Sequence, residues 1–258
     1  MKLATYNVNS IRVRIDAVLA WLESHSPDVL CIQETKCQDE VFPLLLLSSS
    51  GYHVQFRGMK SYNGVAILTK EPPDAVTFGF DDQLPESDGA RLIHVVFQGI
   101  PIINTYVPNG FKLGTPQYEY KLQWFARLRN YFSKHLAPDR PAIWCGDMNV
   151  APAPIDVHSP EKHLQHVCFH ESVREAYQQT VGWGFVDVFR RLYPDRQQFT
   201  FWDYLRPSSL EKNKGWRLDH ILATRPLAEK CRIVDVDIAP RRQPRASDHT
   251  FVWAEFDI

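Results

Sequence analysis

The chain has 258 residues, of which 44% are hydrophobic and 23% are charged. This mixture is typical of a folded globular protein and excludes a disordered or fibrous one. No apolar run reaches the roughly 20 residues of a membrane span, and a formal net charge of −1 excludes nucleic-acid binding through bulk positive charge, though not through a local basic rim.

Short segments rich in apolar, β-branched or aromatic residues predict strands, because most are too short for helices. In chain order these segments are Leu3–Tyr6, Val29–Gln33, Tyr52–Phe56, Val65–Leu68, Leu92–Phe97, Ile102–Val107, Ala142–Cys145, Phe199–Trp202, Arg217–Ala223, Ile233–Ile238 and Thr250–Phe256.

Three helices are predicted between these strands. Ser10 is a candidate cap for a helix over residues 11–22, Thr115-Pro116 begins a second helix, and a third covers Glu171–Gln179. Because strands and helices do not alternate regularly, we expect an α/β protein of two packed sheets with helices outside. Since there is no repeat, linker or break in composition, a single domain over residues 1–258 is expected.

The cysteines and the N-terminal segment indicate the cellular compartment in which the protein is expected. None of the five cysteines forms a Cys-x-x-Cys pair, so reduced thiols are expected. The first residues lack the apolar core of a signal peptide. We therefore expect a cytoplasmic protein, nucleoid-associated if prokaryotic, with no membrane partner and, by default, a monomeric state.

Polar residues suited to acid–base or metal chemistry stand at the ends of predicted strands, or within one of them. For any single position a solvated turn or a helix cap is the more frequent explanation, but Asp219 lies inside an apolar segment, where an unpaired carboxylate is costly. A sheet can bring strand ends to one rim, so the whole set predicts a functional site. The set is Asn7, Glu34, Asp147, Asn149, Asp219, Asp248 and His249.

Such a rim supports hydrolysis at phosphorus. Carboxylate and amide oxygens without thiolates suit Mg²⁺, with Mn²⁺ as an alternative. An aspartate next to a hydrogen-bonding asparagine can orient and deprotonate water, and a histidine paired with a second aspartate can stabilise charge on phosphoryl oxygens. The chain has no G-x-G-x-x-G, P-loop, G-x-S-x-G or H-E-x-x-H motif that would indicate another chemistry.

Four histidines gather in one segment, at positions 158, 163, 166 and 170. Their spacings of five, three and four residues do not match a closed zinc site. A polar loop near the substrate is the preferred interpretation.

Many short motifs follow one another over nearly the whole chain. They are residues 6–12 (YNVNSIR), 33–36 (QETK), 63–66 (NGVA), 105–110 (TYVPNG), 146–152 (GDMNVAP), 185–187 (FVD), 199–204 (FTFWDY), 215–219 (GWRLD) and 247–249 (SDH). In these motifs and their order, the chain resembles the exonuclease III family of apurinic/apyrimidinic (AP) endonucleases, within the endonuclease/exonuclease/phosphatase superfamily. The resemblance implies a four-layer α/β sandwich, with two mixed β-sheets packed face to face and helices on the outside.

The resemblance also implies roles for the polar residues. Glu34 would hold Mg²⁺, with Asn7 and Asp248 contributing directly or through water. Asp147 would activate water with help from Asn149. His249, hydrogen-bonded to Asp219, would contact the phosphate, as would Tyr106.

A further group of residues is implied to bind substrate. Phe201, Trp216 and Leu218 would form an apolar pocket for a base-free sugar, which needs no base to be unstacked. Leu205 would face the gap in the duplex, although ordinary packing under a loop explains it equally well. Asn9 and Asn109 complete the set implied to contact substrate.

Two features complete the sequence expectations. The family usually has proline two residues after the histidine of its Ser-Asp-His motif, whereas this chain has Phe251, which is expected to loosen the turn before the last strand. Phosphate contacts must come from a basic rim. Its candidates are Arg57, Lys60, Lys112, Lys121, Lys212, Lys214, Arg217, Arg241 and Arg242.

The function implied is a Mg²⁺-dependent hydrolase that cuts duplex DNA 5′ to an abasic site and leaves a 3′-hydroxyl. The family also suggests 3′→5′ exonuclease and 3′-end-cleaning activity, with double-stranded DNA as the partner. Two alternatives stay open: a superfamily phosphatase or phosphodiesterase acting on an inositol or lipid phosphate, and a catalytically silent DNA-binding relative. The sequence does not set the balance of these activities, activity on damaged bases or uracil, the number of metal ions, or protein partners.

Overall fold

The computed structural model describes residues 1–82, 86–206 and 208–258. Two six-stranded sheets form its centre, in the orders β11-β12-β1-β2-β4-β3 and β5-β6-β7-β8-β10-β9. The strands of the first sheet are β1 (Lys2–Asn7), β2 (Val29–Gln33), β3 (His53–Arg57), β4 (Val65–Thr69), β11 (Cys231–Asp237) and β12 (Phe251–Phe256). The strands of the second are β5 (Ala75–Phe78), β6 (Leu92–Phe97), β7 (Ile100–Tyr106), β8 (Ile143–Asp147), β9 (Phe185–Asp187) and β10 (Asp219–Thr224).

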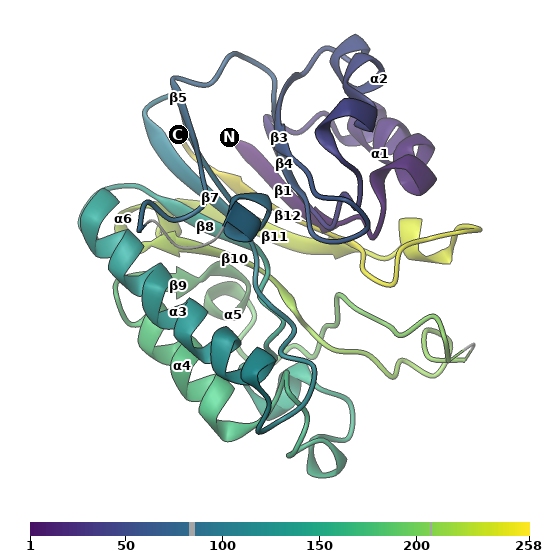
Figure 1. Ribbon diagram of the computed structural model, residues 1–258, viewed down its shortest axis with the longest axis vertical. Coiled ribbons are helices and arrows are strands. Elements are labelled where there is room, and N and C mark those ends of the chain that lie inside the picture. Colours follow the sequence, from purple (N-terminus) through teal and green to yellow (C-terminus); the bar gives the residue numbers. More distant parts are fainter. Residues whose placement is uncertain (83–85, 207) are drawn as a thin grey trace.

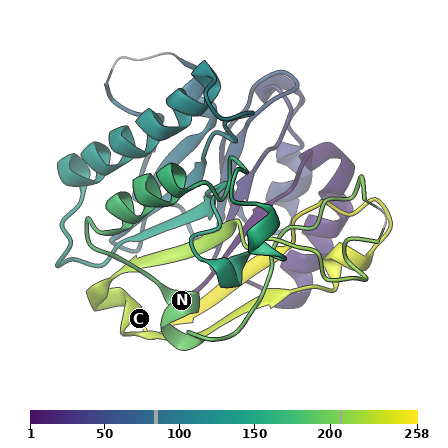
Figure 2. The ribbon, with the colours of Figure 1, turned by 90° about the horizontal axis from the view of Figure 1, so that it is seen from below.

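Helices cover the outer faces of both sheets (Figure 1). The helices are α1 (Ile11–His25), α2 (Leu44–Ser49), α3 (Pro116–His135), α4 (Glu171–Val181), α5 (Val188–Leu192) and α6 (Arg225–Ala228). Seen from below, α3 and α4 run side by side on one flank, and α1 lies on the other (Figure 2). Within the described residues, no helix is both long and apolar enough to cross a membrane.

Three apolar clusters separate the layers. One lies between the sheets and includes Leu3, Val29, Ile102 and Ile143. A second packs α3 and α4 on the second sheet, and a third packs α1 and α2 on the first. Strands buried on both faces explain the continuous apolar runs of the sequence. The four-layer sandwich is therefore confirmed.

The predicted strands match the first sheet and the central strands of the second sheet well, and they miss both edges of the second sheet. Val29–Gln33 and Leu92–Phe97 have the predicted bounds. Residues 199–202 were expected to form a strand but make only isolated bridges, from Phe201 to Trp216 and to His249. The edge strands β5 and β9 were not predicted, since they are short and only partly buried and therefore carry a weak apolar signal.

The helix starts give one confirmation and one correction. The Thr115 side chain accepts a hydrogen bond from the Tyr118 N–H, as predicted for the cap of α3. Ser10 makes no side-chain capping bond, so its predicted role is wrong. Instead, the Ser10 and Ile11 N–H groups donate to the carbonyls of residues 34 and 35. The start of α1 is thereby tied to the loop after β2.

Topology brings the predicted polar residues to one end of the sandwich. β1 and β2 pair in parallel, as do β7 and β8, so each pair ends at the same edge of its sheet. β10 is antiparallel to β8, with Asp219 opposite Asp147. β12 is antiparallel to β1, which places the segment before it at the same end.

Candidate active site

Asp147 is fixed where β8 ends. Gly146 precedes it with φ +129°, and a Cβ there would lie 2.0 Å from the Thr105 carbonyl oxygen, so only glycine fits. Two residues later, the Asn149 N–H donates to Asp147 Oδ1 at 2.9 Å, and the Asn149 amide donates to the Val107 carbonyl at 2.9 Å. The turn after β8 therefore holds the carboxylate and the amide side by side, as the sequence predicts.

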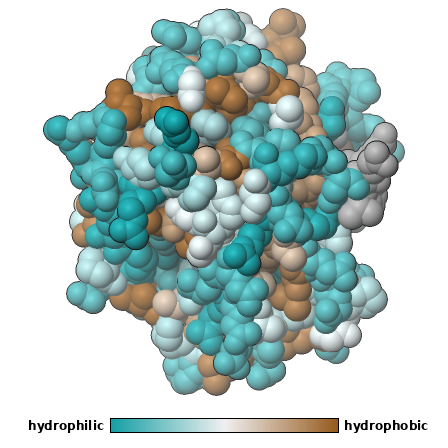
Figure 3. Space-filling view, turned by 90° about the vertical axis from the view of Figure 1, so that its left-hand side faces the viewer, coloured by the Kyte–Doolittle hydropathy of each residue, from teal (hydrophilic) through white to brown (hydrophobic). Residues whose placement is uncertain are grey.

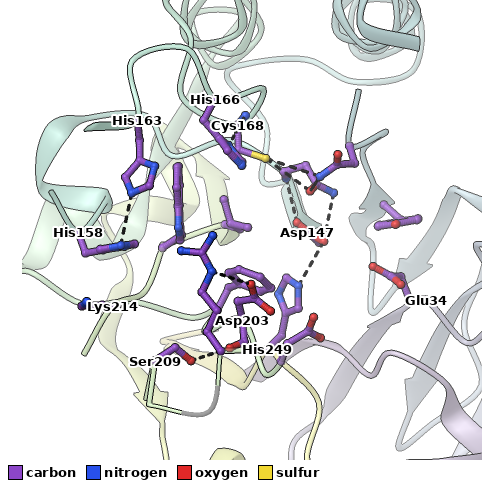
Figure 4. A pocket seen from close by; sticks show the side chains of 18 of the residues that line it. Glu34, Asp147, His158, His163, His166, Cys168, Asp203, Ser209, Lys214 and His249 are labelled. Carbon is purple, nitrogen blue, oxygen red and sulfur yellow. Dashed lines mark hydrogen bonds and ion pairs between the residues drawn. The ribbon is translucent and has the colours of Figure 1, made fainter. Parts of the chain in front are cut away.

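Asp219 and His249 form a buried pair. His249 Nδ1 lies 2.7 Å from Asp219 Oδ2, and the Thr200 hydroxyl donates to the same oxygen at 2.6 Å. His249 Nε2 points toward Asp147 Oδ2 at 3.8 Å (Figure 4). Burial alone would lower the pKa of His249, but the Asp219 and Asp147 carboxylates outweigh it and raise this pKa to about 10. The imidazole is therefore a cation at neutral pH.

Glu34 follows β2 of the first sheet and lies near Asp147, which ends β8 of the second sheet. The Asn7 amide nitrogen donates to Glu34 Oε1 at 2.8 Å and to Asp147 Oδ2 at 2.9 Å. Lys36 Nζ lies 2.6 Å from Glu34 Oε2. Burial opposes ionisation of Glu34, but Lys36 and the Asn7 hydrogen bond outweigh it and lower its pKa. One amide thus joins a carboxylate from each sheet.

Two more predicted residues, Asn9 and Asp248, are hydrogen-bonded to each other next to Glu34 and His249. The Asn9 amide donates to Asp248 Oδ1 at 2.9 Å, and its own oxygen accepts from Lys36 Nζ at 2.6 Å. The main chain of Asn9 takes a left-handed φ of 43°, a conformation that asparagine tolerates well. Asn9 therefore couples Asp248 to the residues around Glu34.

The donor set fits a hard cation. Burial raises the pKa of Asp147, with the His249 cation in part opposing it and the Asp219 and Glu34 carboxylates adding to it. A cation between Glu34 and Asp147 would relieve the repulsion between their buried charges. Asp219, Asp147 and His249 also bring candidate ligand atoms within 4.8 Å of one another, but a protonated imidazole offers no lone pair. The carboxylate oxygens thus favour a site at Glu34, next to Asp147.

A pocket of about 550 Å³ opens beside these charges (Figure 4). Phe201, Trp216 and Leu218 supply its apolar lining, and the Phe201 ring packs 4.9 Å from the His249 ring. The isolated bridges that join Phe201 to Trp216 and to His249 fix this wall to the charged centre.

Most of the predicted site residues lie in this pocket. Those that line it are Glu34, Tyr106, Asn109, Asp147, Asn149, Phe201, Trp216, Leu218, Asp248 and His249. Asp219, Asn7 and Asn9 lie directly behind them as hydrogen-bond partners. Leu205 is outside the lining and 80% exposed, which excludes ordinary packing as its explanation.

Two members of the predicted basic rim are buried, so their assignment was wrong. Lys121 on α3 is fully buried and donates to the Asn109, Asn149 and Val167 carbonyls at 2.8–2.9 Å. Burial lowers its pKa. The ammonium therefore ties together three loops that border the pocket.

Arg217 is the second buried member. Its guanidinium bonds Asp156 at 2.7 Å and Asp187 at 2.7 Å. It thereby holds the segment that carries Trp216 and Leu218. Sequence reasoning gave Lys36 and Thr200 no role, although both lie inside motifs that were recognised; Arg206, which lines the pocket, carried no signal.

Phe251 occupies the position where proline was expected. Its ring stacks on Tyr6 at 3.9 Å and on Trp21 at 4.3 Å between ring centroids. The His249 N–H donates to the Ser247 hydroxyl at 3.2 Å. Aromatic packing thus anchors the beginning of β12, and the looser turn expected from loss of the proline stays a prediction.

Known proteins are similar to this chain in both sequence and structure. Residues 4–249 match the model of the endonuclease/exonuclease/phosphatase family. The chain belongs to this family. It is 32% identical over 267 residues to exodeoxyribonuclease III of Haemophilus influenzae, covering 99% of this chain and 100% of the relative. This family member therefore also belongs with the exonuclease III-type enzymes.

Solved structures give the same assignment. An AP endonuclease from Archaeoglobus fulgidus superposes with a TM-score of 0.97 and 50% identity over 100% of both chains. The 3′ phosphatase NExo from Neisseria, bound to a product DNA hairpin, superposes with a TM-score of 0.94 and 35% identity, again over 100% of both chains. Both similarities extend over the whole of this family member, including the pocket.

Proposed function

We propose that this protein is a single-domain, Mg²⁺-dependent nuclease that hydrolyses duplex DNA 5′ to an abasic site. The observation that carries the proposal is the position of Asp147, between the His249 cation and Glu34, in a pocket that has an apolar wall of Phe201, Trp216 and Leu218. The named relatives support DNA as the substrate. Mn²⁺ is the alternative ion, since the donors are oxygen atoms.

The residues divide the hydrolysis between them. Asp147, oriented by Asn149, accepts a proton from water as the water oxygen bonds to phosphorus. The bond from phosphorus to the 3′-oxygen breaks, and this oxygen takes up a proton from solvent, leaving a 3′-hydroxyl on one side and a 5′-phosphate on the abasic sugar. The His249 cation and the protonated Tyr106 hydroxyl face the charge that grows on the phosphoryl oxygens. A divalent ion held by Glu34, with Asn7 and Asp248 nearby, would neutralise charge on the same phosphate.

Substrate selection rests on the apolar wall. A base-free sugar can enter against Phe201, Trp216 and Leu218 without the cost of unstacking a base. We assign Asn9 and Asn109 to contacts around the phosphate, and exposed Leu205 to contact with the opened duplex. We also propose that the protein acts as a monomer on DNA in the cytoplasm or nucleoid.

A second activity, removal of blocking groups from 3′ ends and 3′→5′ degradation, is proposed because Neisseria NExo is named a 3′ phosphatase and a 3′–5′ exonuclease. Both reactions use the same phosphate position with a terminal nucleotide. The catalytically silent alternative is disfavoured, because every residue assigned to catalysis is present and correctly grouped.

The test uses a duplex with one tetrahydrofuran abasic analogue, a duplex with a 3′-phosphate, and an inositol polyphosphate. With Mg²⁺ we expect incision 5′ to the analogue, and none with EDTA. Asp147→Asn should keep duplex binding and lose at least about 100-fold in kcat, because only the proton acceptor changes. Cleavage of the inositol phosphate with no incision of either duplex would reject the nuclease proposal.

A further inference from the structure

Three histidines lie on the opposite side of the pocket from the Asp147–His249 centre (Figure 4). His158, His163 and His166 surround the Trp216 ring, with centroid distances of 6.2, 4.9 and 4.5 Å. The fourth histidine of the segment, His170, instead accepts the Ser172 N–H at the start of α4. The catalytic scheme above uses none of these histidines.

The first two histidines face each other through ring nitrogens. His158 Nε2 and His163 Nε2 are 3.4 Å apart. His158 Nδ1 lies 3.2 Å from the Gly215 carbonyl oxygen, which can only accept a hydrogen bond, so the ring proton is on Nδ1 and the Nε2 lone pair of His158 accepts a hydrogen bond from His163 Nε2. A histidine that donates its other nitrogen to a carbonyl is the usual form of a metal ligand.

The separation suits a tetrahedral ion. Two nitrogens, each about 2.0–2.1 Å from zinc at a tetrahedral angle, lie about 3.4 Å apart. The pair can therefore chelate an ion at this separation once His163 carries its ring proton on Nδ1 instead of Nε2. No third side chain is needed from the protein, since water can fill the remaining positions of an open site.

The surroundings determine which ion would bind. Burial and the neighbouring His158 lower the pKa of His163, so its ring is neutral and able to ligate near pH 7. Arg206 and Lys162 oppose a cation here, and Glu161 attracts one. Within the described residues, the pair belongs to no group of three His, Cys, Asp or Glu ligands. Two imidazoles alone select Zn²⁺, Ni²⁺ or Cu²⁺ over Mg²⁺.

We propose that His158 and His163 form a second metal site, for a borderline divalent ion such as Zn²⁺, on the Trp216 side of the pocket. An ion there with its waters narrows the space beside Trp216. Occupancy therefore inhibits entry of the nucleotide. The inhibition rests on the proposed nuclease function, whereas ion binding does not.

Calorimetry with zinc chloride tests the binding, with millimolar Mg²⁺ present throughout to occupy the carboxylate site. We expect one Zn²⁺ to bind the wild-type protein with micromolar affinity, and His163→Ala and His163→Gln each to weaken binding at least tenfold. His53→Ala removes an exposed histidine from β3 as a matched control and should change nothing. Equal affinity in the wild type and both His163 variants, or no binding below 100 µM in the wild type, would overturn the site.

The proposed inhibition by Zn²⁺ is measured on the abasic duplex. For the wild type and for each variant, the cleavage rate with Zn²⁺ is divided by the rate of the same protein without Zn²⁺. Wild-type cleavage should fall about twofold at the calorimetric Kd and at least fivefold at about ten times that concentration, and the ratio for both His163 variants should stay near one. Equal inhibition of the wild type and the variants would overturn the regulation. A protein that binds Zn²⁺ at the pair but cuts no DNA refutes the proposed function and leaves the metal site standing.

Discussion

At the scale of single residues, the site depends on charged side chains that are buried away from water. Asp147, Asp219 and His249 are almost completely buried, where an unpaired ion is unstable. Each is therefore paired, and the pairing fixes the protonation state that the chemistry needs. Asp219 keeps His249 positive, and His249 in turn makes an ionised Asp147 tolerable.

Asp219→Asn tests this dependence. Without the carboxylate, burial dominates and the pKa of His249 falls from about 10, so the imidazole is neutral over part of the working range. We expect kcat to fall about 100-fold, equivalent to about 2.7 kcal/mol, and the alkaline limb of the pH–rate profile to move to lower pH. Thr200→Val, which removes a hydrogen bond but keeps the charge, should leave that limb in place. An unshifted limb in Asp219→Asn contradicts the assignment.

His220 makes a different prediction, about stability. It is buried between the Tyr177 hydroxyl and the Arg217 carbonyl, and burial together with the Arg217 cation lowers its pKa to about 4. The unfolded chain binds the proton near pH 6.5. Between about pH 6.5 and 4, unfolding therefore takes up a proton and stability falls as the pH falls, by up to about 1.4 kcal/mol per unit.

The measurement compares urea unfolding at several pH values in that range. His220→Gln should show a shallower loss of the free energy of unfolding with acid than the wild type, whatever its absolute stability. His53→Gln, at an exposed position, should keep the wild-type slope. If His220→Gln retains the full slope, other groups cause the acid sensitivity.

At the scale of elements, the loops around the pocket depend on a helix behind them. α3 supplies Lys121, whose buried ammonium donates hydrogen bonds to three loop carbonyls. Arg217 performs a similar task for the segment between residues 215 and 219. Buried cations thus shape the pocket from behind while contacting none of the proposed reacting atoms.

Lys121→Met should expose this role. Three buried carbonyls lose their donor, at a cost of about 1–3 kcal/mol for each group left unsatisfied. We expect destabilisation of at least about 2 kcal/mol, together with a fall in kcat larger than the change in KM, because the Asn149 loop moves. Lys134→Met lies on the same helix in an exposed pair with Asp81 and should cost less than about 1 kcal/mol. Thermal unfolding and steady-state kinetics of both variants decide the matter.

At the scale of the whole molecule, the two sheets pack face to face, and the site forms at the end where strand ends of both sheets converge. A net charge of −1 means that affinity for DNA must come from local groups. The face shown in Figure 3 is mainly hydrophilic, with scattered apolar patches. Arg206 and Lys214 line the pocket itself and are the basic groups best placed for phosphate contact.

Salt dependence follows from this arrangement. Three phosphate contacts would give a slope of log affinity against log salt near −2.7, so that binding weakens about 40-fold between 50 and 200 mM salt. Measured with the Asp147→Asn protein by fluorescence anisotropy, Arg206→Ala and Lys214→Ala should each reduce the slope by about one. Lys70→Ala, near the exposed Asp28 and outside the pocket, is the control. A flat salt response would show that the rim does not contact phosphate.

Local patterns in the sequence were enough for the central strands, for the cap at Thr115 and for the family motifs. Their signals come from neighbours in the chain, since β-branched runs and capping residues act over a few positions. The edge strands β5 and β9 were not predicted, because partly buried segments lack a clear apolar pattern. The same limit explains Ser10, whose helix is started by carbonyls from residues 34 and 35.

The sequence by itself determined which functional side chains are present: the oxygen donors, the histidine and the apolar residues of a phosphodiester hydrolase. It also determined that they are carried by a framework of two sheets. Only the tertiary structure decided their partners, because those partners lie far away in the chain. Asn7 bridges Glu34 and Asp147 across the two sheets, and Lys121 and Arg217 are buried instead of reaching solvent. Whether a charged side chain binds substrate or holds the fold depends on which distant acceptors surround it, and a linear pattern does not contain that information.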